Sequence, residues 1–128
     1  MPDPEQRRVV SPRGGLLHVI DAAGYSLAGL RRLLNETAAR LELLGICAVA
    51  LAFLWRGAAL WHWAAFAGLA ALVLTVEALN TAVEVLVDHV SPGWSQMAKD
   101  AKDLGSLAVG LMLTITAGFV ALVVAGLI

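Results

Sequence analysis

Residues 58–88 read AALWHWAAFAGLAALVLTVEALNTAVEVLVD, a stretch that is apolar for most of its length but carries Glu77, Glu84 and Asp88 in its second half. As one helix it would be about 45 Å long at 1.5 Å per residue, more than the roughly 30 Å of a bilayer's hydrocarbon core. It must therefore tilt, or project into the headgroup region at one end. The stretch predicts a membrane-spanning helix, and its acids need an explanation of their own.

The composition of the whole chain also indicates a membrane protein. Of its 128 residues 59% are hydrophobic and only 15% are charged, and the mean hydropathy is +0.79. The chain is too apolar for an ordinary soluble domain, and its formal net charge of −1 gives no indication of a nucleic-acid partner. We expect a single all-α membrane domain with an N-terminal amphipathic surface helix and three transmembrane helices. The expected segments are a disordered start over 1–15, the surface helix over 16–40, transmembrane helices over 41–57, 58–88 and 104–128, and a cytoplasmic loop over 89–103.

The basic residues predict the orientation of the chain in the membrane. Most of the nine Lys and Arg residues lie in the first 40 positions, and Lys99 and Lys102 lie between the second and third apolar stretches. Because cytoplasmic segments are enriched in basic residues, the N-terminus and 89–103 are expected on the cytoplasmic side. The surface helix is expected to lie in the inner interface, because its apolar residues recur at spacings of three and four. Its apolar face consists of Ile20, Ala23, Leu27, Leu30 and Leu34.

The polar side chains of 76–88 share one face of the predicted helix. At 100° per residue they fall within an arc of about 100°, and they rise by about 16 Å along the axis. Each ionisable group near the centre of a membrane helix costs roughly 2.5–3.5 kcal/mol on insertion scales, so acids that persist there are expected to have a function. We call this face the acidic stripe, and it consists of Glu77, Asn80, Thr81, Glu84 and Asp88.

An acidic stripe that includes an amide and ends near lysines is typical of a site for a divalent cation and a phosphate. Mg²⁺ takes one or two protein carboxylates and fills its other positions with phosphate and water oxygens. A carboxylate that holds no metal can act as a general base. Glu36 is a further candidate, because its helix is expected at the same cytoplasmic level. The chain has no GxxxxGK[ST] loop and no HRD or DFG motif, so neither large class of kinases fits.

Other functions remain open at this point. The acids could relay protons or cations in a transport protein, but 64–76 has no charged residue and only Thr75 as a polar side chain. The acids near the helix end could simply keep that end in water. A non-catalytic assembly protein could use the small residues of the third apolar stretch for packing, which leaves the acids unexplained. A site for a divalent cation and a phosphate is the interpretation that accounts for the acids, and these residues alone leave the reaction open.

Two motifs carry a resemblance to a known family. Residues 76–90, VEALNTAVEVLVDHV, followed by residues 98–109, AKDAKDLGSLAV, resemble the small bacterial integral-membrane diacylglycerol kinases. Residues 22–31, AAGYSLAGLR, and 35–42, NETAARLE, are similar to that family's surface helix. The resemblance implies phosphorylation of a membrane lipid alcohol with ATP and Mg²⁺, by a homotrimer of the bacterial inner membrane whose sites lie between subunits. Diacylglycerol is the expected acceptor, and undecaprenol, the acceptor of a sister group, is the alternative.

The resemblance also implies roles for individual residues. Glu77 is expected to be the general base with Asn80 beside it, and Glu36 and Glu84 are expected to bind the metal. The nucleotide is expected to contact Tyr25, Glu36, Glu84, Asp88, Gly93, Trp94, Ser95, Lys102 and Asp103. The lipid is expected to contact Ala22, Ala23, Tyr25, Arg31, Arg40, Glu77 and Ser106.

Overall fold

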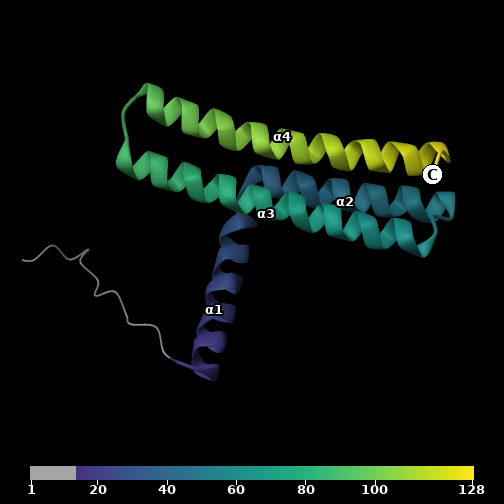
Figure 1. Cartoon of the computed structure of the whole chain (residues 1–128), viewed down its shortest axis with the longest axis horizontal. Coiled ribbons are helices and arrows are strands. Elements are labelled where there is room, and N and C mark those ends of the chain that lie inside the picture. Colours follow the sequence, from purple (N-terminus) through teal and green to yellow (C-terminus); the bar gives the residue numbers. More distant parts are fainter. Residues whose placement is uncertain (1–13) are drawn as a thin grey trace, which may run out of the picture. The chain divides into compact units, whose positions relative to one another are not determined.

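The computed structural model describes residues 14–128, and this part of the chain is built from helices without a strand (Figure 1). The helices are α1 (Leu16–Leu33), α2 (Thr37–Arg56), α3 (Leu60–Val90) and α4 (Gln96–Ala125). Residues up to Arg32 form one structural unit and Leu33–Ile128 form another, so α1 is described by itself. The prediction of an all-α protein is confirmed. The disordered start expected over 1–15 falls mostly on residues 1–13, which lie outside the described part.

Three of these helices, α2, α3 and α4, are long and apolar enough to cross a membrane, as the sequence predicted. They run side by side, with the α2–α3 turn and the C-terminus at one end and the α3–α4 connection at the other (Figure 1). We call the second end, from Glu84 of α3 to Asp103 of α4, the charged end. Because α2 is shorter than α3 and α4, it begins part-way along α3 (Figure 1).

A hydrophobic core shared by α2, α3 and α4 lies toward the end away from the charged end. Phe53 of α2 is fully buried against Phe66 of α3 and Val123 of α4. The ring of Trp63 meets Phe53 edge-on, with centroids 5.5 Å apart and planes at 87°. Aromatic pairs in this geometry stabilise by about 0.5–1.5 kcal/mol beyond the area they bury. This core ties the three helices together and so fixes the directions in which they carry polar side chains.

The helix expected over 16–40 is interrupted in the structure. α1 ends at Leu33, Glu36 has extended backbone with φ −77° and ψ 137°, and α2 begins at Thr37. The guanidinium of Arg40 donates from Nε to the carbonyl of Leu34 at 3.0 Å and from Nη2 to that of Asn35 at 2.9 Å. Carbonyls at a helix end lack helical hydrogen-bond donors, and here one arginine of the next helix donates to them. Asn is also a poor helix former, which favours a break at this point.

The segment expected as a loop over 89–103 is mostly helical. α3 continues to Val90, and α4 already begins at Gln96. Ser95 starts α4 as its N-cap, because its side-chain oxygen accepts a hydrogen bond from the amide of Ala98 at 3.1 Å. Lys99 and Lys102 therefore lie in the first turns of a helix, and the helix backbone fixes the directions of their side chains.

Candidate active site

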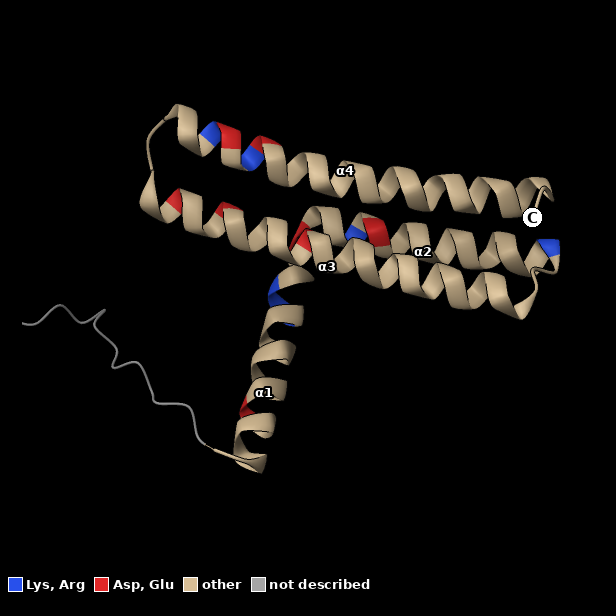
Figure 2. Cartoon of the chain, in the orientation of Figure 1, with Lys and Arg blue, Asp and Glu red and all other residues tan. Residues whose placement is uncertain are grey.

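α3 carries the acidic stripe, and burial decreases along it. Glu77 is only 5% exposed and Thr81 8%, whereas Asn80 and Glu84 are half-buried and Asp88 is exposed. Figure 2 shows the charges of α4 confined to its first turns, next to the last turns of α3. The stripe therefore runs from a buried carboxylate between helices to an exposed one at the charged end.

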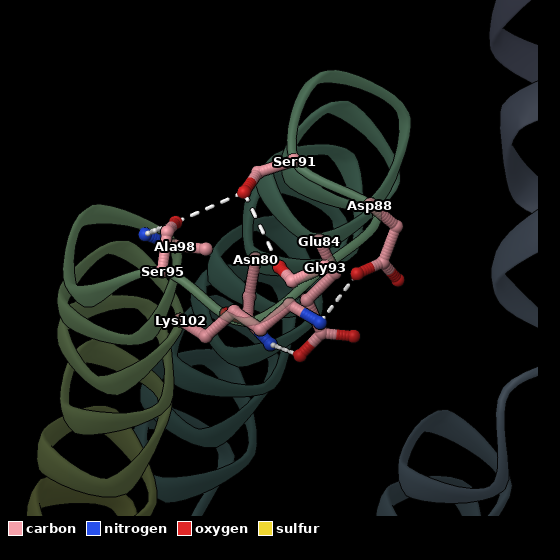
Figure 3. A network of polar contacts seen from close by, with 8 residues as sticks. All are labelled: Asn80, Glu84, Asp88, Ser91, Gly93, Ser95, Ala98 and Lys102. Atoms are coloured by element: carbon pink, nitrogen blue, oxygen red, sulfur yellow. Dashed lines mark hydrogen bonds and ion pairs between the residues drawn. The ribbon is translucent and has the colours of Figure 1, made fainter.

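Asn80 and Glu84 form a hydrogen-bonded pair in the middle of the stripe. The amide Nδ2 of Asn80 donates to Oε1 of Glu84 at 3.1 Å (Figure 3). This bond fixes one oxygen of the carboxylate and leaves the other free to accept. Oδ1 of Asn80 is buried and makes no hydrogen bond within the described part of the chain. Asn80 thus orients Glu84, which is the side chain expected to bind a metal.

An ion pair joins α4 to α3 at the charged end. Nζ of Lys102 lies 2.5 Å from Oδ1 of Asp88, and both side chains are substantially exposed (Figure 3). Lys99 pairs with Asp103 one turn further along α4. Exposed ion pairs stabilise a fold by only about 0–1 kcal/mol. A phosphate can therefore exchange with Asp88 as the partner of Lys102 at small cost to stability.

Nearby, the α3–α4 connection is held by two serines. The hydroxyl of Ser91 donates to the carbonyl of Gly93 at 3.3 Å and lies 2.9 Å from the hydroxyl of Ser95 (Figure 3). Trp94 between them is 81% exposed. Of the residues expected to contact nucleotide, Gly93 and Ser95 are thus hydrogen-bonded within the short connection that also contains Trp94.

Glu42 is a site residue that the sequence analysis did not identify. It lies on α2, is half-buried, and its carboxylate interacts electrostatically with that of Glu77 on α3. Its Oε2 atom is buried and has no hydrogen-bond partner among the described residues. Glu42 also lines an otherwise largely apolar groove of about 690 Å³ between α2, α3 and α4. Its sequence signal was an acid at the start of the apolar run LELLGICAVA, where an ionisable group points to function.

The two carboxylates expected to bind the metal both interact electrostatically with the expected general base. Those of Glu36 and Glu84 both lie within electrostatic range of Glu77. Within residues 14–128 of a single chain, no cluster of three or more acidic, histidine or cysteine side chains is arranged to hold a metal. One or two carboxylates are enough for Mg²⁺ when phosphate and water supply its other ligands, so Glu36 and Glu84 fit this ion.

The residues expected to contact lipid are spread over all four helices. Ser106 is exposed on α4, and Arg40 uses its guanidinium on the carbonyls of the α1–α2 turn. Glu77, also expected to contact lipid, is buried on α3. The remaining four lie on α1, and all are exposed on that helix: Ala22, Ala23, Tyr25 and Arg31.

Comparison with known proteins decides the family. The model of a family described as prokaryotic diacylglycerol kinase matches residues 24–125, which is most of the chain and includes all of α2 and α3. The chain belongs to the prokaryotic diacylglycerol kinase family. The match confirms the resemblance carried by the two motifs of α3 and α4.

Curated relatives named diacylglycerol kinase are similar over most of their length. One from Sinorhizobium sp is 46% identical over 77% of this chain and 72% of its own. One from Pseudomonas aeruginosa is 39% identical over 79% of this chain and 83% of its own. One from Escherichia coli K12 is 34% identical over 74% of this chain and 79% of its own. Membership in the family therefore rests on most of the chain and not on one motif.

Proposed function

We propose that the chain is a diacylglycerol kinase, which transfers the γ-phosphoryl group of ATP to the free hydroxyl of diacylglycerol and forms phosphatidic acid. The observation that carries this proposal is the graded acidic stripe of α3 in a member of this family. A buried carboxylate at one end suits a lipid hydroxyl, and the exposed Lys102–Asp88 pair at the other suits a soluble nucleotide. The relatives' names favour diacylglycerol over undecaprenol as the acceptor.

In this mechanism Glu77 is the general base. The lipid oxygen attacks the γ-phosphorus, the bond from that phosphorus to the bridging oxygen of ADP breaks, and the hydroxyl proton passes to the Glu77 carboxylate. Phosphoryl transfer requires mainly positioning and neutralisation of charge, and little covalent assistance from the protein. Burial of Glu77 between helices keeps water, a competing acceptor, away from the transferred group.

The nucleotide is held at the charged end. Lys102 releases Asp88 and pairs with a phosphate, while Asp103 and the connection 91–95 contact the rest of the nucleotide. Glu36 and Glu84 would hold Mg²⁺, and the hydrogen bond from Asn80 would keep the Glu84 carboxylate turned for that purpose. The metal, when bound, neutralises charge on the phosphate oxygens. The residues of α1, with Tyr25 and Arg31 among them, border the nucleotide or the lipid.

The working form is a homotrimer with shared sites in the bacterial inner membrane. Large apolar side chains of α3 and α4 are more than half exposed in the single chain, among them Leu79, Leu86 and Leu107, and other subunits or lipid would cover them. A second subunit could also add ligands to those that one chain supplies. The N-terminus and the charged end face the cytoplasm, because most basic residues lie there.

The test is transfer of radiolabelled phosphate from ATP into the lipid fraction of mixed detergent micelles. Purified protein with Mg²⁺ and diacylglycerol should yield labelled phosphatidic acid, and no label should appear when Mg²⁺ is chelated. A higher rate with undecaprenol than with diacylglycerol would overturn the proposed acceptor. Absence of label from both lipids would overturn the proposed activity.

A further inference from the structure

Gly105 of α4 packs directly against the Asn80 side chain of α3. A Cβ atom built on Gly105 would lie 2.1 Å from Oδ1 of Asn80 and 3.2 Å from its Cγ. Contacts under about 3 Å do not occur between such atoms, so any side chain at position 105 would displace the amide. Gly110 and Gly118 lie on the same helix and have no atom within 4 Å of the equivalent position. Among the glycines within α4, the close approach is therefore specific to Gly105.

The atom that meets Gly105 is the end of a side chain and not backbone. A methyl group at position 105 can be accommodated if the Asn80 amide rotates away, so the helices need not separate. Rotation would, however, carry Nδ2 away from Oε1 of Glu84, 3.1 Å from it in the structure. The methyl group would thus weaken the Asn80–Glu84 hydrogen bond and leave the packing of the helices in place.

Oδ1 of Asn80 is buried without a hydrogen bond within residues 14–128. A buried amide oxygen without a partner is costly, and its free rotamers would normally turn it toward a donor or water. The Asn80 side chain adopts this orientation because α4 approaches it at Gly105, where no Cβ atom occupies the space. We propose that Gly105 is a positioning residue of the site. Because it has no side chain, the Asn80 amide can stay in place and keep its hydrogen bond to Glu84.

This inference rests on the proposed function only for its effect on activity. Its direct test is the Asn80 side-chain amide itself. The chain has two asparagines, Asn35 and Asn80, so ¹⁵N-asparagine labelling gives two side-chain amide signals in a micelle NMR spectrum. Gly105→Ala should shift the Asn80 signal and leave that of Asn35 in place, and Gly110→Ala should leave both in place. An unmoved Asn80 signal in Gly105→Ala would overturn the proposal.

The second readout is lipid phosphorylation as a function of Mg²⁺ concentration. Gly105→Ala should lower the rate about ten- to a hundred-fold at limiting Mg²⁺, the size expected for one hydrogen bond to a charged group. Part of the rate should return at high Mg²⁺, and the melting temperature in detergent should stay near that of the wild type. A purely structural role would lower the melting temperature and would not respond to Mg²⁺.

A double-mutant cycle separates action through Asn80 from general crowding of α4. In an Asn80→Ala background the clash is gone, so adding Gly105→Ala should change the rate less than about twofold. An additive loss in the double variant would overturn the proposal, as would full activity of Gly105→Ala. If the wild type phosphorylates no lipid, the proposed function fails, and the Asn80 signal still decides this inference.

Discussion

Replacing Glu77 with Gln tests the most buried acid of the stripe. Glu77 is 5% exposed, and three other carboxylates, those of Glu36, Glu42 and Glu84, interact with it electrostatically. Gln has nearly the same shape but carries no charge and cannot take the proton of the lipid hydroxyl. Removal of a general base typically lowers a rate by about 10²–10⁴. We expect a fall of this size in lipid phosphorylation at saturating substrates.

The same substitution should leave the nucleotide in place. Glu84 lies about 10 Å further along the axis of α3, so we do not expect Glu77 and Glu84 of one unbent helix to hold the same metal ion. The affinity for Mg²⁺–ATP should therefore change little. The melting temperature should be unchanged or higher, since an uncharged side chain replaces one carboxylate of a crowded acidic group.

The assay is a pair of measurements on purified protein in micelles. Isothermal titration gives the affinity for Mg²⁺–ATP, and radiolabel transfer to diacylglycerol gives the rate. Thr75→Val is the matched control on the same helix, because among the described residues the Thr75 hydroxyl donates only to the carbonyl of Ala71, at 2.8 Å. Collapse of the affinity with an unchanged rate at saturation would refute the assignment, because Glu77 would then be a ligand and not the base.

Three other substitutions give further tests. Glu42→Leu should raise the free energy of unfolding by about 1–3 kcal/mol, since it removes a half-buried carboxylate that interacts electrostatically with Glu77. The same change should lower the rate of lipid phosphorylation. Lower stability in a detergent melt would contradict this prediction. Lys102→Ala should raise the KM for ATP about ten- to a hundred-fold, the effect of one charged hydrogen bond, and Lys99→Ala should change it far less. Equal effects of the two lysines would argue against a phosphate contact at Lys102. Arg40→Ala should lower the free energy of unfolding by about 1 kcal/mol, because two carbonyls lose their donor, and Arg40→Lys should not restore it.

The periodicity of the sequence was enough to predict the acidic stripe. Because α3 is regular from Leu60 to Val90, 100° per residue puts Glu77 and Glu84 on one face wherever the helix lies. Hydropathy likewise predicted three spans, since a helix that crosses a membrane needs a long apolar run whatever its neighbours are.

Features that depend on contacts between distant residues could not be predicted in this way. The break after α1 depends on where the Arg40 guanidinium finds carbonyl acceptors, and helical periodicity alone continues through it. Glu42 has no partner acid on its own helix face, and its relation to Glu77 exists only when α2 packs on α3. In the sequence Gly105 is an ordinary small residue, and its contact with Asn80 is evident only in the structure.

The difference in helix lengths explains how one site can serve two substrates of opposite polarity. Glu42, in the second turn of α2, interacts with Glu77, so α2 begins near that level of α3. α3 continues for about 20 Å beyond Glu77 to Val90, at 1.5 Å per residue. Within the α2–α4 unit that last part is accompanied by α4 alone (Figure 1). In the proposed function, Glu77, which lies among three helices, would meet the lipid hydroxyl, while Lys102 and Asp88, which lie beside two helices of this unit, would meet the nucleotide.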